Sequence, residues 1–273
     1  MMKTSFSTLA CPDWTLSKVI DAAAKYSYDG IELRVISREL DLWKLPAFKP
    51  SSLPATRAAI ECRGLAVVAA NSSACFHSPD AAERERNFDS ALRMAEIAAG
   101  LGARAIRVFG DTIQPSNSRA DTARWIADSL LRLADELKPT GVQVWLETHG
   151  DFSSAADVGN LFALLGRNDI GIIWDPANAF DRYGEMPNIS STMAPRIRHV
   201  HLKDLSKNSK GLSRFVLTGE GDFPFNQMFD SLAAIGFDGF VSFEWEKQWH
   251  PELAPPDEAL PHFIQWLKSR KSA

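Results

Sequence analysis

Four segments of the chain share one pattern: VQVWLE (142–147), IGIIWD (170–175), IRHVHL (197–202) and GFVSFE (239–244). Each is a short apolar run that carries an acidic residue or a histidine at or near its end. Their length and composition are typical of strands buried on both faces of a parallel sheet. Four more β-prone segments precede them in the chain: KTSF (3–6), GIELR (30–34), LAVVAAN (65–71) and RAIRVFG (104–110).

The spacing of these eight segments predicts a barrel. Their centres lie about 27 to 41 residues apart, and a strand–helix unit needs roughly 30. Most intervals hold a helical pattern: 15–26, 80–100, 119–138, 153–165, 224–235 and 257–268. The pattern is weaker over 176–196, and the first half of 205–238 is polar. A doubly wound sheet usually shows a glycine-rich turn after its first strand, which is missing here. We therefore expect a single (β/α)8 TIM-barrel domain over residues 1–273.

Composition restricts the class of protein. The chain has 273 residues and a formal net charge of −4, so it lacks the basic excess of a nucleic-acid-binding protein. It has no apolar run near the ~18 residues of a membrane span, and MMKTSFSTLACPDW (1–14) has no signal-peptide core. The three cysteines form no CxxC pair. We expect a reduced, cytoplasmic protein with a small-molecule substrate and no nucleic-acid or membrane partner; a homo-oligomer is compatible with this.

Polar residues end the last four predicted strands. They are Glu147, Asp175, His201 and Glu244, and the carboxyl ends of barrel strands converge around one axis. One such residue alone is usually an ion-pair or capping residue, but four at equivalent positions indicate a site. Unpaired buried carboxylates cost several kcal/mol each, and a divalent cation compensates them. Oxygen-rich ligands with one nitrogen favour Mn²⁺, with Mg²⁺, Co²⁺ or Zn²⁺ as alternatives.

Further polar residues are expected near this end of the barrel and are our candidates for substrate binding. Strand parity turns Glu32 and Arg107 inward, although a structural ion pair between them is an equal alternative. His199 is expected one layer below His201, most simply as a hydrogen-bonded core residue. The remaining candidates lie at the mouth or in the loops: His77, which is equally well an ordinary loop residue, His149, Asn178 and Lys203.

Six segments resemble the sugar phosphate isomerase/epimerase family of the xylose isomerase-like TIM-barrel superfamily: DGIELR (29–34), LETHGDF (146–152), WDPAN (174–178), HVHLKD (199–204), GEGDFPF (219–225) and FVSFEWE (240–246). The resemblance implies that Glu147, Asp175, His201 and Glu244 bind one divalent metal ion. It selects His201 over His199 as the ligand. It also implies that Glu147 and Glu244 exchange protons with the substrate. The keto-sugar 3-epimerases of the family carry other residues where this chain has Ser153, Asn178 and Lys207.

The resemblance implies an isomerase or epimerase for a sugar or related polyol ketone. Such an enzyme removes a proton beside a carbonyl and forms a metal-stabilised enediolate. The alternative is a dehydratase of the inosose or dehydroshikimate type, which would use the same site. An abasic-site endonuclease needs more histidines than the six present and a basic DNA groove. A sugar-binding barrel without activity would not need a complete ligand set.

Overall fold

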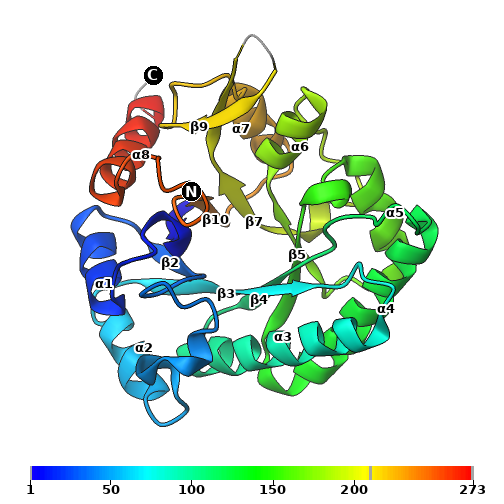
Figure 1. The fold of residues 1–273 in the computed structure, drawn as a ribbon. Helices are drawn as coiled ribbons and strands as arrows, with labels where there is room; N and C mark the ends of the chain where they lie inside the picture. The colour runs from blue at the N-terminus through cyan, green and yellow to red at the C-terminus, as the bar shows by residue number, and fades with distance from the viewer. Residues whose placement is uncertain (1, 209–210, 272–273) are drawn as a thin grey trace.

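The computed structural model describes residues 2–208 and 211–271, and in these residues eight parallel strands close into a barrel (Figure 1). The strands run around the barrel in the order β1-β10-β7-β6-β5-β4-β3-β2. All eight predicted strands are confirmed: β1 (Lys3–Ser7), β2 (Gly30–Leu33), β3 (Ala66–Cys75), β4 (Ala105–Phe109), β5 (Gln143–Glu147), β6 (Gly171–Trp174), β7 (Ile197–Leu202) and β10 (Phe240–Phe243).

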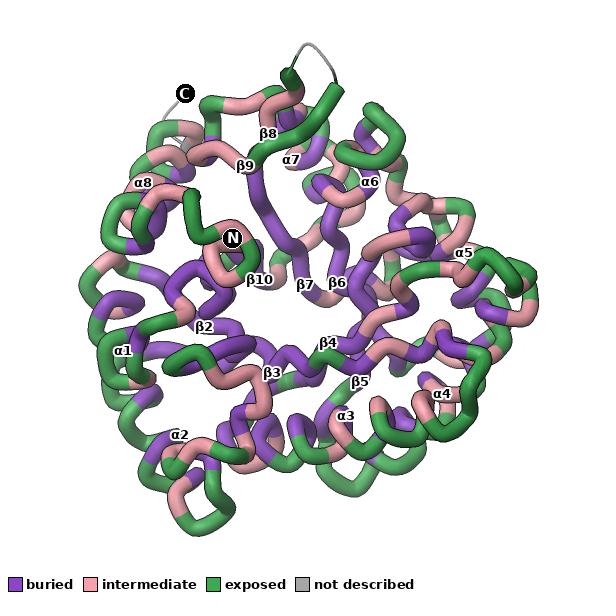
Figure 2. Tube along the Cα trace, in the orientation of Figure 1, coloured by how far each residue is buried: buried purple, intermediate pink, exposed green. Residues whose placement is uncertain are grey.

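Helices form the outer ring of the barrel (Figure 1). They are α1 (Leu16–Lys25), α2 (Leu53–Glu61), α3 (Ala81–Leu101), α4 (Arg119–Leu137), α5 (Ala155–Leu165), α6 (Pro176–Tyr183), α7 (Phe225–Ala234) and α8 (Pro256–Lys271). Several begin at a side chain that accepts a backbone N–H of the first turn, as Thr15 does from Lys18 and Asp80 from Ala82. Figure 2 shows the barrel strands largely buried and the outer helices exposed on the side away from them.

The interior of the barrel is apolar in one layer and polar in the next. Val68, Ala69, Ala105, Trp145, Ile173 and Phe240 form a buried cluster of their own. Two residues further along their strands, the same parity brings Arg107, Glu147 and Asp175 to the carboxyl ends. The apolar layer fills the lower part of the barrel, and the polar groups are therefore collected at one mouth.

Two features differ from the expectations, helix α2 and a hairpin after β7, whereas the segment 176–196 agrees with its weak helical pattern. Helix α2 was not anticipated, because Leu53–Glu61 is short, carries Pro54 in its first turn and has no side-chain N-cap. The polar segment after β7 contains an antiparallel hairpin of β8 (Asp204–Lys207) and β9 (Ser213–Val216). The residues of β9 are exposed or half-buried, so they lack the apolar signature of a core strand. The weak region 176–196 contains only the short helix α6 and one further turn.

No helix among the described residues combines the length and the apolar character needed to cross a bilayer.

Packing of the outer helices on the barrel gives a stability prediction. Leu130 of α4 is completely buried, whereas Leu164 of α5 is 51% exposed. We expect Leu130→Ala to lower the free energy of unfolding by about 2–5 kcal/mol, because it removes buried methyl groups and leaves a cavity. The matched variant Leu164→Ala should change it by about 0.5 kcal/mol or less. Chemical denaturation of both variants measures the difference, and equal effects would contradict the described packing.

Candidate active site at the barrel mouth

Four ionisable side chains from neighbouring strands meet at the carboxyl end of the barrel. Glu147 ends β5, Asp175 follows β6, His201 lies on β7 and Glu244 follows β10. One ligand atom from each lies within 4.8 Å of the others, and all four residues are buried. Asp175 also begins α6, where its Oδ1 accepts the N–H groups of Ala177 and Asn178. The other carboxylate oxygen of Asp175 is left to face the cluster.

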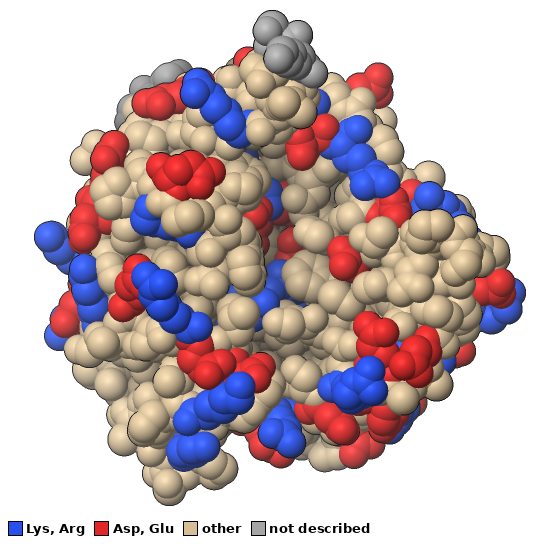
Figure 3. Space-filling view, in the orientation of Figure 1, with Lys and Arg blue, Asp and Glu red and all other residues tan. Residues whose placement is uncertain are grey.

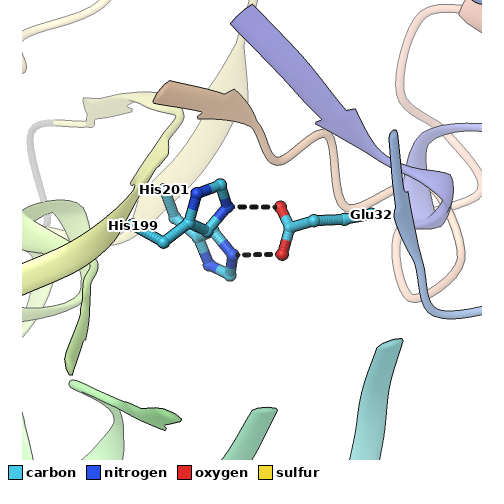
Figure 4. A group of neighbouring side chains, drawn as sticks. All are labelled: Glu32, His199 and His201. Atoms are coloured by element: carbon cyan, nitrogen blue, oxygen red, sulfur yellow. Dashed lines mark hydrogen bonds and ion pairs between the residues drawn. The ribbon is translucent and has the colours of Figure 1, made fainter. Parts of the chain in front are cut away.

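A buried carboxylate on β2 orients His201 (Figure 4). His201 Nε2 lies 3.0 Å from Glu32 Oε2, and His199 Nε2 lies 2.9 Å from Glu32 Oε1. Asn71 donates a hydrogen bond to the same carboxylate. His201 Nδ1 is thereby turned toward the cluster, 3.2 Å from Glu244 Oε1 and 3.6 Å from Glu147 Oε1. In metal sites, a histidine ligand usually has one ring nitrogen hydrogen-bonded to a carboxylate, and the other nitrogen binds the metal ion.

Two cations reach the carboxylates but do not balance them. Arg107 Nη1 lies 2.5 Å from Glu147 Oε2. Lys203 Nζ lies 2.8 Å from Asp175, 2.7 Å from Glu244 and 2.7 Å from Glu246. With His201 neutral, the form that binds a metal ion, these four carboxylates and two cations leave a formal charge of −2. Glu244, Glu32 and Glu147 outweigh the effect of burial and raise the pKa of His201 well above its usual range, so without a metal ion the cluster takes up a proton at His201.

The pKa values of two of these carboxyls are shifted in opposite directions. Burial alone would raise the pKa of Glu147, but Arg107 and His201 outweigh it and lower the pKa to about 2. Burial raises the pKa of Asp175 to about 6, despite Lys203, and Glu244 adds to the rise. A further cation would favour the ionised form of both carboxyls.

The cluster fits a divalent metal ion. Its donors are three carboxylates and one imidazole, and the buried His201 Nδ1 has no hydrogen-bond partner among the described residues. A charge deficit of two and an oxygen-rich donor set match Mn²⁺ or Mg²⁺, and Zn²⁺ also accepts such ligands.

A cavity of about 190 Å³ opens directly above the cluster. It is lined by Leu9, Arg34, Arg107, Phe109, Glu147, His149, Lys203, Glu244, Glu246 and Trp249. A larger pocket of about 700 Å³ beside the hairpin β8–β9 shares His149 and Glu246 with it. Figure 3 shows this face hollowed at its centre, with acidic and basic side chains visible inside. A small polar molecule therefore has access to Glu147 and Glu244, whereas Asp175 and His201 are completely buried beneath the cavity wall.

The residues predicted to bind substrate fall into three groups. Arg107, His149 and Lys203 lie in the cavity wall, and Asn178 lines the larger pocket. Glu32 is completely buried and is absent from both linings. His77 also lines neither, and lies instead near Cys75 and Asp111.

The structure also rules out one of the alternatives from the sequence. It pairs Arg107 with Glu147, and Glu32 with both histidines, so an ion pair between Glu32 and Arg107 is not formed. Glu32 thereby lies in contact with His201 rather than in the cavity wall.

Two charged residues of the cavity wall were missed in the sequence, Arg34 and Glu246. Each lies two positions beyond a residue that strand parity had singled out, Glu32 and Glu244. The same step of two leads from Glu147 to His149 and from His201 to Lys203. Extending the alternation beyond every strand end would have found both residues.

The sequence matches the model of a known family, described as xylose isomerase-like TIM barrel, over residues 20–270. The chain belongs to this family. Among curated relatives, an inosose dehydratase of Serratia proteamaculans is 30% identical over 162 residues, which are 52% of this chain and 53% of that protein. A 2-oxo-tetronate isomerase of Haemophilus influenzae is 22% identical, over 60% of this chain and 63% of that protein.

The chain also has the same fold as solved structures of xylose isomerase-like TIM barrels. A crystal structure of IolI protein with a bound zinc atom superimposes with a TM-score of 0.80 at 19% identity, covering 97% of this chain and 96% of that one. The chain spans about half to two thirds of the length of the first curated relatives it matches. The relatives include both an isomerase and a dehydratase. Family membership therefore establishes the superfamily but does not identify the reaction.

Proposed function

We propose that the chain is a metal-dependent isomerase or epimerase that moves a proton beside the carbonyl of a sugar or polyol ketone. The observation that carries this proposal is the pair Glu147 and Glu244, buried together with Asp175 and His201 below an open polar cavity. Two carboxylates beside one bound substrate allow one to remove a proton and the other to return it. Return to the opposite face gives an epimer, and return to the neighbouring carbon gives an isomer.

Each residue of the site has a role in this proposal. A divalent cation held by Glu147, Asp175, His201 and Glu244 would polarise the substrate carbonyl and stabilise the negative charge left by proton removal. We assign Mn²⁺ on the oxygen-rich donor set, and the zinc in the IolI structure supports a divalent ion in this fold. Arg107, His149 and Lys203 line the cavity and would donate hydrogen bonds to substrate oxygens. Glu32 orients His201 from below.

A dehydratase is the second candidate, and the similarity to inosose dehydratase favours it. It would share the first step. The carbanion would then expel a hydroxyl group from the β-carbon, and protonation of that group would release water. An abasic-site endonuclease has less support, because the cavity wall does not form the basic groove that DNA requires.

The test is hydrogen exchange in D₂O. Mn²⁺-loaded protein is incubated with a panel of keto-sugars, inosose and dehydroshikimate, and carbon-bound deuterium is located by NMR. We expect deuterium on the carbon beside the carbonyl of at least one compound, above a control without protein. A shifted carbonyl or an inverted centre identifies the isomerase or epimerase, and an unsaturated or deoxy ketone identifies the dehydratase. Absence of exchange from the whole panel would count against both.

A further inference from the structure

Arg34 is a buried cation in the cavity wall that has no acidic partner. Arg34 is only 5% exposed, and it lines the cavity together with Arg107 and Lys203. Arg107 and Lys203 are both paired with carboxylates. Among the described residues, none forms an ion pair with Arg34, and its Nη1 is buried without a hydrogen-bond partner. Of these three cations of the cavity wall, Arg34 alone is therefore left without a carboxylate partner among the described residues.

The guanidinium is held in place without being neutralised. Arg34 Nη2 donates to the hydroxyl of Ser73 at 2.7 Å. The backbone N–H groups of Arg34 and Val35 both donate to Thr8 Oγ1, which fixes the chain just beyond β2. Burial, followed by the nearby Arg107, lowers the pKa of Arg34 to about 9, so the group remains cationic at pH 7.

A buried charge without a partner is costly, and proteins normally pair it or expose it. Arg34 follows neither course, because its guanidinium donates only to the neutral hydroxyl of Ser73 among the described residues, and Glu147 and Asp41 act on its charge without forming an ion pair with it. A bound anion would supply the missing partner and would accept from the free Nη1. Guanidinium groups suit this role because they recognise carboxylates and phosphates in a planar geometry.

We propose that Arg34 binds an anionic group of the substrate, carboxylate or phosphate, in the cavity that Glu147 and Glu244 also line. This inference rests on the proposed function, which accounts for the reacting end of the substrate. It defines the class of the substrate as an acidic sugar or polyol. The alternative is that Arg34 is purely structural and is held by Ser73. In that case, loss of the charge would destabilise the fold and leave anion binding unchanged.

Calorimetric titration of the full-length, Mn²⁺-loaded protein tests the proposal with three probes: D-glycerate, glycerol 3-phosphate and uncharged glycerol. We expect wild type to bind at least one anion tenfold or more tightly than glycerol. Arg34→Met should weaken anion binding by about 10- to 100-fold and leave glycerol unaffected. The better anion distinguishes a carboxylate from a phosphate. Arg38→Met is the matched control, because Arg38 is 78% exposed and pairs with Asp13. It should bind like wild type.

Thermal unfolding of the same proteins separates binding from stability. The melting temperature of Arg34→Met should equal or exceed that of wild type without ligand, because an unpaired buried charge is removed. Arg34→Lys provides a second variant that keeps the charge and should retain part of the anion preference. The proposal is overturned if wild type does not prefer either anion to glycerol, or if Arg34→Met binds the anions as wild type does. Because binding needs no turnover, failure of hydrogen exchange would leave this result interpretable.

Discussion

Glu244→Gln is expected to reduce hydrogen exchange on the substrate by about 10²–10⁴-fold, the contribution of a positioned acid or base. The variant keeps the volume of the side chain and removes its capacity to accept a proton. Glu147→Gln should have a comparable effect, since the proposal needs one carboxylate to remove the proton and another to return it. Rates of deuterium incorporation at saturating Mn²⁺ measure both effects.

Two further variants show which part of this loss is due to the proton acceptor. Asp175→Asn changes a proposed ligand that takes no proton, and asparagine still accepts the N–H groups at the start of α6. It should recover much of its exchange rate at high Mn²⁺, whereas Glu244→Gln should not. Glu258→Gln, on the exposed face of α8, should match wild type. Exchange at the wild-type rate in Glu147→Gln or Glu244→Gln would rule out the two-carboxylate mechanism.

Removal of divalent metal is expected to abolish hydrogen exchange and to lower the melting temperature. The carboxylate cluster carries a formal charge of −2 when His201 is neutral, so a bound divalent cation should stabilise the folded chain. At a metal concentration 100 times its Kd, the stabilisation is about 2.7 kcal/mol, which corresponds to a rise of roughly 5 °C in the melting temperature of a chain of this size.

The control for this experiment restores Mn²⁺ to wild type and to a variant in which one proposed metal ligand is changed. Chelator-treated wild type should regain exchange and thermal stability on addition of Mn²⁺. Asp175→Asn should need a much higher metal concentration for the same rise in melting temperature. Full activity of chelator-treated protein, with metal content verified as negligible, would contradict the proposed site.

The sequence predicted the barrel because its strands are buried on both faces, and continuous apolar runs such as IGIIWD mark such strands clearly. Helices with a polar N-cap residue and buried apolar residues at helical spacing, such as α3 and α4, were equally visible. Helix α2 and the hairpin β8–β9 were not, because short or exposed elements depend on contacts that are distant in sequence. The strand pairing itself, such as Phe240 opposite His199, follows from the closed fold.

The candidate site was predictable as far as strand parity reaches. Alternation along β5 and β7 singled out Glu147, His149, His199 and His201. The partner of each charge was not predictable, because it depends on side chains that reach across the barrel. Glu32, expected to contact substrate or Arg107, instead lies against both histidines. The unpaired state of Arg34 likewise becomes visible only when its surroundings are known.

We propose that the four strand-end side chains form one divalent metal site, and calorimetric titration of metal-free protein with Mn²⁺ is the direct test. We expect one ion bound per chain in wild type. We also expect affinity at least 100-fold lower in a variant carrying both Asp175→Asn and Glu244→Gln. Absence of binding to wild type, or equal affinity in the double variant, would contradict this proposal.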